Sequence, residues 1–270
     1  MSSIGIVGAG QLGGVLARRL TALGYEVSVA NSRGPSSLRD FAVASGAKAV
    51  EISELAAEAR LLILAIPLGA IPRLPKDLVA SWRHGQTIVD AGNYIPLRDG
   101  PILQIDEGMP ESVWVAQQLG LPVVKAFNSI SDLSLEHGGR PAGALNRIAL
   151  PVAGDDPQTR AAVMKLVEEL GFDALDAGSL ANSWRQQIGQ RAYCTDGTRD
   201  QLAALLARAR ADSVKPKRDV AMKLMSRLPP HFPKTTLLSG ARFMAGLDRS
   251  KPANWLAVLR LASVMMRPSR

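Results

Sequence analysis

The stretch that decides the fold is SIGIVGAGQLGG, residues 3–14. Its first five residues are apolar or small, as in a short buried strand, and the glycines that follow end that strand. Leu12, Leu16 and Leu20 then recur at helical spacing. The pattern predicts a strand over 3–7, a tight glycine turn, and a helix over 12–23.

The turn contains Gly8, Gly10 and Gly13, which have the spacing GxGxxG. Gly8 permits the tight turn, Gly10 lets backbone N–H groups approach a diphosphate, and Gly13 lets the helix pack closely on the strand. The helix N-terminus adds N–H donors and a partial positive charge. Because the motif follows a strand and opens a helix, we expect a dinucleotide-binding site here, with Gln11 and Leu12 among its contacts.

The rest of the chain alternates between short apolar runs and helical segments. This alternation indicates an α/β fold with helices on both faces of the sheet. We expect a Rossmann-type doubly wound, mainly parallel sheet of about eight strands with a helical C-terminal extension. The expected strands are 3–7, 26–30, 48–50, 61–66, 86–90, 122–127, 147–153 and 172–176.

Composition excludes several classes of protein. The chain has 270 residues and is 47% hydrophobic, which is enough for a large core. Its single cysteine, Cys194, excludes an internal disulfide framework and a cysteine-based zinc site, and its three isolated histidines predict no metal site. No apolar run approaches the ~20 residues that cross a bilayer, and no signal peptide precedes the first strand. We therefore expect a cytoplasmic protein.

Charge is concentrated in the last part of the chain. Residues 197–270 carry 15 basic and 4 acidic residues, a net charge of +11, whereas the preceding residues carry 17 basic and 20 acidic, a net charge of −3. We therefore divide the chain into a dinucleotide-binding Rossmann domain, residues 1–195, and a basic helical C-terminal extension, residues 196–270.

Apolar residues in this extension recur at helical spacing, as at Trp255, Leu259, Ala262 and Met266. The pattern favours helices that pack on the Rossmann domain or on a second subunit, and we expect a homo-oligomer. Peripheral contact of the basic tail with an anionic membrane surface is the alternative. Nucleic acid fits less well, because interleaved aromatic residues and a known binding module are missing.

The end of the second strand selects the cofactor. An NAD site places Asp or Glu at this point to accept from the ribose 2′-hydroxyl, but the chain has Asn31, Ser32 and Arg33. A hydroxyl and a guanidinium suit a 2′-phosphate. The sequence therefore predicts that the cofactor is NADP(H). The alternative for Arg33 is an exposed loop residue without a ligand, and the alternative for Asn31 is a turn residue.

Other strand ends complete the expected cofactor site, because ligands bind at the carboxyl ends of parallel strands. We expect these ends to contribute further contacts: Ala65, Ile66, Pro67, Ala91 and Asn93. Hydride transfer needs alignment and a dry pocket more than an acid or a base. We identify no catalytic relay, and the candidate catalytic residues are Asn93, Asn128 and Arg185.

Neighbouring residues could help to line this pocket. Ser129, Trp184 and Tyr193 are further candidates. The Gly/Pro-rich loop 136–141, which contains His137, forms either a lid over the nicotinamide or a surface connection. Cys194 has no histidine placed to activate it and is interpreted as a small buried side chain.

Taken together, the strand-end sequences resemble the F420-dependent NADP oxidoreductase family, the NADPH-dependent F420 reductases. The shared features are the GxGxxG turn and the stretches NSRGP at 31–35, DAGNY at 90–94, KAFN at 125–128 and DAGSL at 176–180. The resemblance implies an N-terminal Rossmann domain that binds NADP and direct hydride exchange with a flavin-like ring. The acceptor stays open between F420, a flavin, and a small carbonyl or imine compound.

These observations predict an NADP(H)-dependent oxidoreductase that transfers a hydride between the nicotinamide and a flavin-like or other small acceptor. The alternative is an NADP(H)-sensing regulatory or scaffold protein whose basic tail binds a partner or a membrane.

Overall fold

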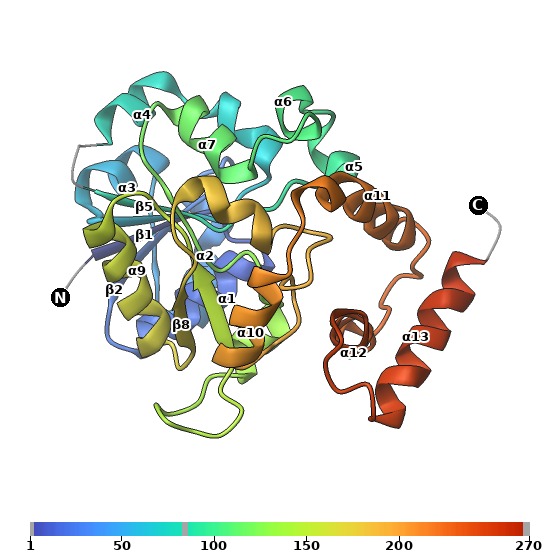
Figure 1. Cartoon of the computed structure of the whole chain (residues 1–270). Coiled ribbons are helices and arrows are strands. Elements are labelled where there is room, and N and C mark those ends of the chain that lie inside the picture. The colour runs from blue at the N-terminus through green and yellow to red at the C-terminus, as the bar shows by residue number, and fades with distance from the viewer. Residues whose placement is uncertain (1–2, 83–85, 267–270) are drawn as a thin grey trace.

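The structure, a computed structural model, describes residues 3–82 and 86–266. Its centre is a six-stranded sheet in which all neighbouring strands run parallel, in the order β3-β2-β1-β4-β5-β6 (Figure 1). The order reverses between β1 and β4, and open α/β sheets bind ligands at such a point. The strands are β1 (Ser3–Val7), β2 (Glu26–Ala30), β3 (Lys48–Ala49), β4 (Leu61–Leu64), β5 (Thr87–Asp90) and β6 (Val124–Lys125).

Helices cover both faces of this sheet. In β4, Ile63 packs into a core cluster with α1 and α9, whereas Leu62 and Leu64 pack into a second cluster with α3 and α7. A strand buried on both faces is continuously apolar, as LLIL is. The helices of this part are α1 (Gln11–Ala22), α2 (Arg39–Ser45), α3 (Ile52–Glu58), α4 (Lys76–Ser81), α5 (Pro96–Asp99), α6 (Leu103–Asp106), α7 (Glu111–Leu119), α8 (Asp132–His137) and α9 (Pro157–Glu169).

Short 3-10 helices complete the connections: η1 (Pro35–Leu38), η2 (Leu68–Arg73), η3 (Leu180–Gln186) and η4 (Ala211–Ser213). Both η1 and η2 lie directly after the loops that follow β2 and β4. The chain therefore turns sharply at these strand ends and leaves their edge of the sheet open.

The expectation of one sheet of about eight strands is wrong in its strand count. The last two strands, β7 (Ala149–Val152) and β8 (Asp173–Asp176), form a separate parallel pair that Figure 1 shows turned across the main sheet. Lys125 and Ala153 make a single antiparallel bridge between the two sheets. Phe127 has a φ of 63°, which turns the chain out of the sheet and ends β6 after two residues.

Four helices form the C-terminal extension: α10 (Arg199–Ala207), α11 (Val214–Met225), α12 (Lys234–Ala245) and α13 (Pro252–Met265). Leu202 and Leu205 of α10 pack into a cluster with Ala149 of β7. Arg218 of α11 is buried and lies 2.6 Å from the carboxylate of Asp106. These contacts hold α10 and α11 against the Rossmann domain, whereas α12 and α13 pair at one side of the molecule (Figure 1).

The apolar stripe of α13 faces outward. The helix buries Asn254, Ala257 and Val264, whereas Trp255 is 53%, Leu259 62% and Met266 78% exposed. The prediction that this stripe packs on the Rossmann domain of the same chain is therefore wrong. Among the described residues, no helix is both long enough and apolar enough to cross a membrane.

Candidate functional site

Three glycines shape the turn between β1 and α1, each for a different reason. Gly8 has a φ of +106°, and a Cβ there would lie 2.5 Å from the carbonyl oxygen of Ala65. A Cβ at Gly13 would overlap the carbonyl oxygen of Gly8. A Cβ at Gly10 would meet nothing within 4 Å. Packing within the chain explains Gly8 and Gly13, but it does not explain Gly10.

The surface over Gly10 fits a diphosphate. Gly10 and Gln11 are exposed, and the first turn of α1 contains no acidic residue. The first N–H groups of a helix have no partner within the helix, and together with the helix dipole they favour an anion. A glycine at this point lets the anion reach those N–H groups.

The loop after β2 lies beside this turn, because the N–H of Gly8 donates to the carbonyl oxygen of Ala30 at 2.8 Å. The side chain of Asn31 shapes the loop: its Oδ1 accepts from the N–H of Arg33 at 2.8 Å and from the hydroxyl of Ser37 at 3.2 Å. Ser32 is exposed. The site therefore has a turn residue, Asn31, next to the exposed side chain of Ser32.

Arg33 has the properties that a 2′-phosphate requires. Its side chain is exposed and has no carboxylate partner within the described part of the chain. A guanidinium that is not already paired can form two parallel hydrogen bonds with phosphate oxygens.

The ends of β4 and β5 continue the same edge of the sheet. The N–H of Ala65 donates to Val7 at 2.9 Å, and the N–H of Ala91 donates to Leu64 at 3.1 Å. Ile66 and Pro67 follow Ala65 and lead into η2. The structure thus brings the glycine turn, the 65–67 segment and Ala91 together, as the order of the strands requires.

Hydrogen bonds join three amide side chains near the ends of β5 and β6. Asn93 donates to the carbonyl oxygen of Asn128 at 2.9 Å, and Asn128 donates to the Oδ1 of Asn93 at 3.2 Å. Gln186 of η3 donates to the Oδ1 of Asn128 at 3.0 Å. Asn128 is 2% exposed, so its side chain fixes η3 against the end of β6, and Asn93 is the more accessible of the two candidates.

Sequence reasoning missed a buried ionic cluster behind this loop. Asp90, Glu111 and Lys125 are each at most 1% exposed. Lys125 Nζ donates to Asp90 Oδ2 at 3.0 Å and to the carbonyl oxygen of Gly92 at 2.6 Å. Gly92 in turn donates its N–H to Asp90 Oδ1 at 2.9 Å. The ion pair therefore clamps both backbone groups of Gly92.

The segment 184–194 brings aromatic and charged groups near the same amides. Arg185, one residue before Gln186, lies 5.5 Å from the ring centre of Trp184, and no carboxylate pairs with it among the described residues. Burial raises the pKa of Tyr193 well above its usual value and raises the pKa of Cys194 to about 12. Cys194 is therefore a neutral thiol and not an activated nucleophile.

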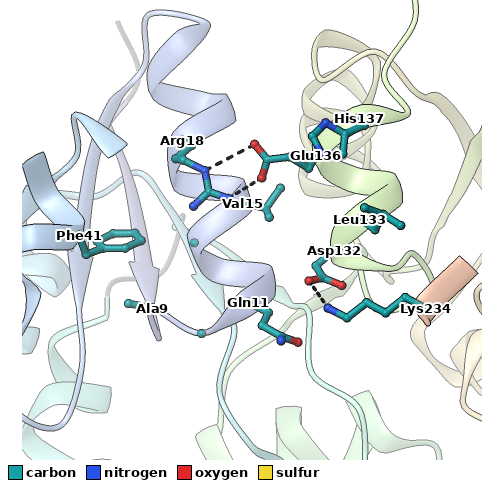
Figure 2. A pocket seen from close by; sticks show the side chains of 12 residues that line it. Ala9, Gln11, Val15, Arg18, Phe41, Asp132, Leu133, Glu136, His137 and Lys234 are labelled. Carbon is teal, nitrogen blue, oxygen red and sulfur yellow. Dashed lines mark hydrogen bonds and ion pairs between the residues drawn. The ribbon is translucent and has the colours of Figure 1, made fainter. Parts of the chain in front are cut away.

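A groove of about 650 Å³ runs along α1 on the side of α8 (Figure 2). It starts at Gln11, where Lys234 of α12 pairs with Asp132 of α8 at 2.6 Å, and it ends where Arg18 pairs with Glu136. Because α1 leads away from the strand ends, the groove leads away from Asn93 and Asn128. We place neither the nicotinamide nor its acceptor in it.

The segment around His137 lies at the far end of this groove (Figure 2). His137 ends α8, and the loop after it is fixed by a hydrogen bond from the N–H of Arg140 to Gly171 at 2.9 Å. Gly171 precedes β8, so this loop lies at the amino end of that strand. It is a surface connection, and the lid interpretation is wrong because α8 has carried the chain away from the strand ends.

The N-terminal part of the chain matches a known protein family. Residues 3–94 match the sequence model of a family described as NADP oxidoreductase, coenzyme F420-dependent. The N-terminal third of the chain therefore matches this family. The matched residues include the glycine turn, the Arg33 loop and the loop that ends β5.

Three known proteins extend the comparison. A hypothetical protein from Sinorhizobium meliloti is 33% identical over 70% of this chain and 91% of its own, with a TM-score of 0.60. A candidate F420-dependent NADP reductase from Arthrobacter sp. FB24 is 22% identical over 68% of this chain and 87% of its own, with a TM-score of 0.56, which shows the fold. The Escherichia coli protein YjhV is 44% identical over 62 residues, 23% of this chain and 45% of its own length.

Proposed function

We propose that this chain is an oxidoreductase that transfers a hydride between NADP(H) and a flat aromatic acceptor, F420 or a flavin. The observation that carries the proposal is the combination of Gly10, whose Cβ position is open, with Arg33, whose exposed guanidinium has no carboxylate partner among the described residues. The first suits a diphosphate and the second suits a 2′-phosphate.

In this proposal the chain binds and orients more than it reacts. The α1 N-terminus holds the diphosphate, Ser32 and Arg33 hold the 2′-phosphate, and the loop that contains Asn93 receives the nicotinamide end. Bound NADPH supplies a hydride, which carries two electrons to the acceptor and leaves the nicotinamide ring positively charged. The buried clamp on Gly92 keeps the receiving loop rigid, which favours alignment of the reacting atoms.

Trp184 and Arg185 support an aromatic, anionic acceptor. Both belong to η3, which Gln186 joins to Asn128 at the end of β6. An aromatic face suits ring stacking, and a cation without a carboxylate partner suits a phosphate or carboxylate tail. A neutral carbonyl or imine compound would use neither group fully. We therefore rank F420 and flavins above small carbonyl acceptors.

The test is oxidation of NADPH, followed by its absorbance, with F420, FMN, FAD and a small imine as acceptors. Turnover with F420 or a flavin, reduced by Arg185→Ala mainly through a higher KM for the acceptor, supports the proposal. NADPH binding without turnover for every acceptor would instead favour an NADP(H)-sensing protein. No binding of NADPH would overturn both.

We also propose that the partner of the C-terminal extension is a second copy of this chain, bound through the exposed face of α13. This outer face is Trp255, Leu256, Leu259 and Met266. Exposed apolar patches of this kind mark interaction sites. A helix that lies on a membrane carries several cations on its polar face, whereas Arg260 is the one charged residue between 252 and 265.

Light scattering coupled to size-exclusion chromatography tests this partner. We expect a dimer that Leu259→Glu converts to a monomer, because the charge would be buried in the contact. Leu145→Glu, at a position that is 86% exposed in the loop after α8, should leave the dimer intact. A monomeric wild-type protein would contradict the proposal, and its sedimentation with anionic vesicles would favour the membrane instead.

A further inference from the structure

The buried cluster behind the β5 loop contains more negative than positive groups. Lys125 lies 3.0 Å from the carboxylate of Asp90 and 3.8 Å from that of Glu111. Two carboxylates thus share one ammonium group. The three side chains are neutral as a set only when one carboxylate holds a proton, and they carry one negative charge when neither does.

The geometry assigns that proton to Glu111. Asp90 accepts hydrogen bonds from Lys125, from the hydroxyl of Ser112 at 2.7 Å and from the N–H of Gly92 at 2.9 Å, so its oxygens have three donors. Oε2 of Glu111 is buried and has no hydrogen-bond donor among the described residues. Burial raises the pKa of Glu111 to about 7, and Lys125 only partly opposes this rise.

Other ionisable groups also face Glu111. Arg218 of α11 is paired with Asp106 at 2.6 Å, and it also lies over the ring of Tyr94 at 4.8 Å. Burial raises the pKa of both Tyr94 and Tyr193, so both phenols stay neutral. The cluster therefore changes charge near neutral pH through Glu111.

We propose that Glu111 sets the preference of the cofactor site between oxidised and reduced nicotinamide. The inference rests on the proposed function, which puts the nicotinamide at the ends of β5 and β6. The oxidised ring is a cation and the reduced ring is neutral. Ionised Glu111 gives the cluster a net negative charge that attracts the cation, whereas protonated Glu111 removes this attraction.

The cluster is joined directly to the loop. Lys125 and Asp90 contact the backbone of Gly92, and the carboxylate of Glu111 lies 3.8 Å from Lys125 Nζ. Unit charges about 10 Å apart in a medium of effective dielectric constant about 20 change an affinity by roughly tenfold. Proton release from Glu111 should therefore favour NADP⁺ over NADPH by about that factor.

Titration calorimetry with NADP⁺ and NADPH at about pH 6 and about pH 8.5, on either side of the pKa of Glu111, tests the inference. Both dinucleotides carry the same 2′-phosphate, so its ionisation cancels in the ratio of the two Kd values. For wild type we expect this ratio to move about tenfold toward NADP⁺ at the higher pH. Glu111→Gln should abolish the change, and Glu107→Gln, on the exposed surface just before α7, should retain it.

A second measurement needs no variant. Calorimetry near pH 7 in buffers of different ionisation enthalpy counts the protons exchanged on binding, and NADP⁺ should release more protons than NADPH. Binding of both dinucleotides with no pH-dependent ratio and equal proton counts would overturn the role of Glu111 alone. So would an unchanged pH dependence in folded Glu111→Gln. If wild type binds neither dinucleotide, the proposed function fails first.

Discussion

Replacing Gly10 and Gly13 by alanine separates ligand binding from folding. The Cβ of Gly10→Ala meets no atom within 4 Å, and Gly10 has a φ of −73°, which alanine adopts easily. Weaker capping by alanine and the lower entropy of the unfolded chain nearly cancel, so we expect the free energy of unfolding to change by less than about 1 kcal/mol. The added methyl group would instead occupy the position of the diphosphate, and NADPH affinity should fall by at least about tenfold, ~1.4 kcal/mol.

Gly13→Ala should behave in the opposite way. Its Cβ would overlap the backbone oxygen of Gly8, and backbone cannot move aside as the end of a flexible side chain can. We expect a loss of about 3 kcal/mol or more in stability. Urea unfolding and calorimetry with NADPH are the assays. If Gly10→Ala binds NADPH as tightly as wild type, or is as unstable as Gly13→Ala, then packing and not a ligand explains Gly10.

The ionic cluster gives two further predictions. Folding raises the pKa of Glu111 from 4.5 to about 7. Below about pH 4.5, Glu111 is protonated in both the folded and the unfolded protein. Between about pH 4.5 and about pH 7, Glu111 loses its proton only in the unfolded protein. Wild type should therefore lose roughly 3 kcal/mol of stability relative to Glu111→Gln as pH rises through this window, and parallel unfolding curves for the two proteins would contradict this. Lys125→Met leaves Asp90 buried without its cation and should cost about 3–5 kcal/mol in urea unfolding. Adding Asp90→Asn should recover part of that loss, and no recovery would contradict the pairing.

The first half of the fold is predictable because its information is local. The glycine turn, the apolar run of β4 and the leucine spacing of α1 each lie within a dozen residues. The loop after β2 also allows a prediction from local sequence, because Ser32 and Arg33 occupy the place where an acidic residue would select NAD. Local patterns of this kind determine both the elements and the expected cofactor contacts.

The features that sequence analysis missed depend on contacts between distant residues. Asp90, Glu111 and Lys125 meet only when β5, α7 and β6 are assembled, and each of them alone resembles an ordinary surface charge. The separate β7–β8 sheet follows a left-handed residue, Phe127, which is unexpected because glycine usually occupies that region. The exposed apolar stripe of α13 has the same sequence pattern as a buried stripe. Helical spacing shows which residues share a face of the helix, but it does not show what that face contacts.

The most direct test of the central claim is calorimetry of NADPH and NADH binding to wild type and Arg33→Ala. We expect wild type to bind NADPH about 10- to 100-fold more tightly than NADH, as a charge-assisted phosphate contact would provide. Arg33→Ala should lose most of that difference through NADPH alone, and Arg208→Ala, an exposed arginine at the end of α10, should keep it. Equal affinities of wild type for the two dinucleotides would contradict the account.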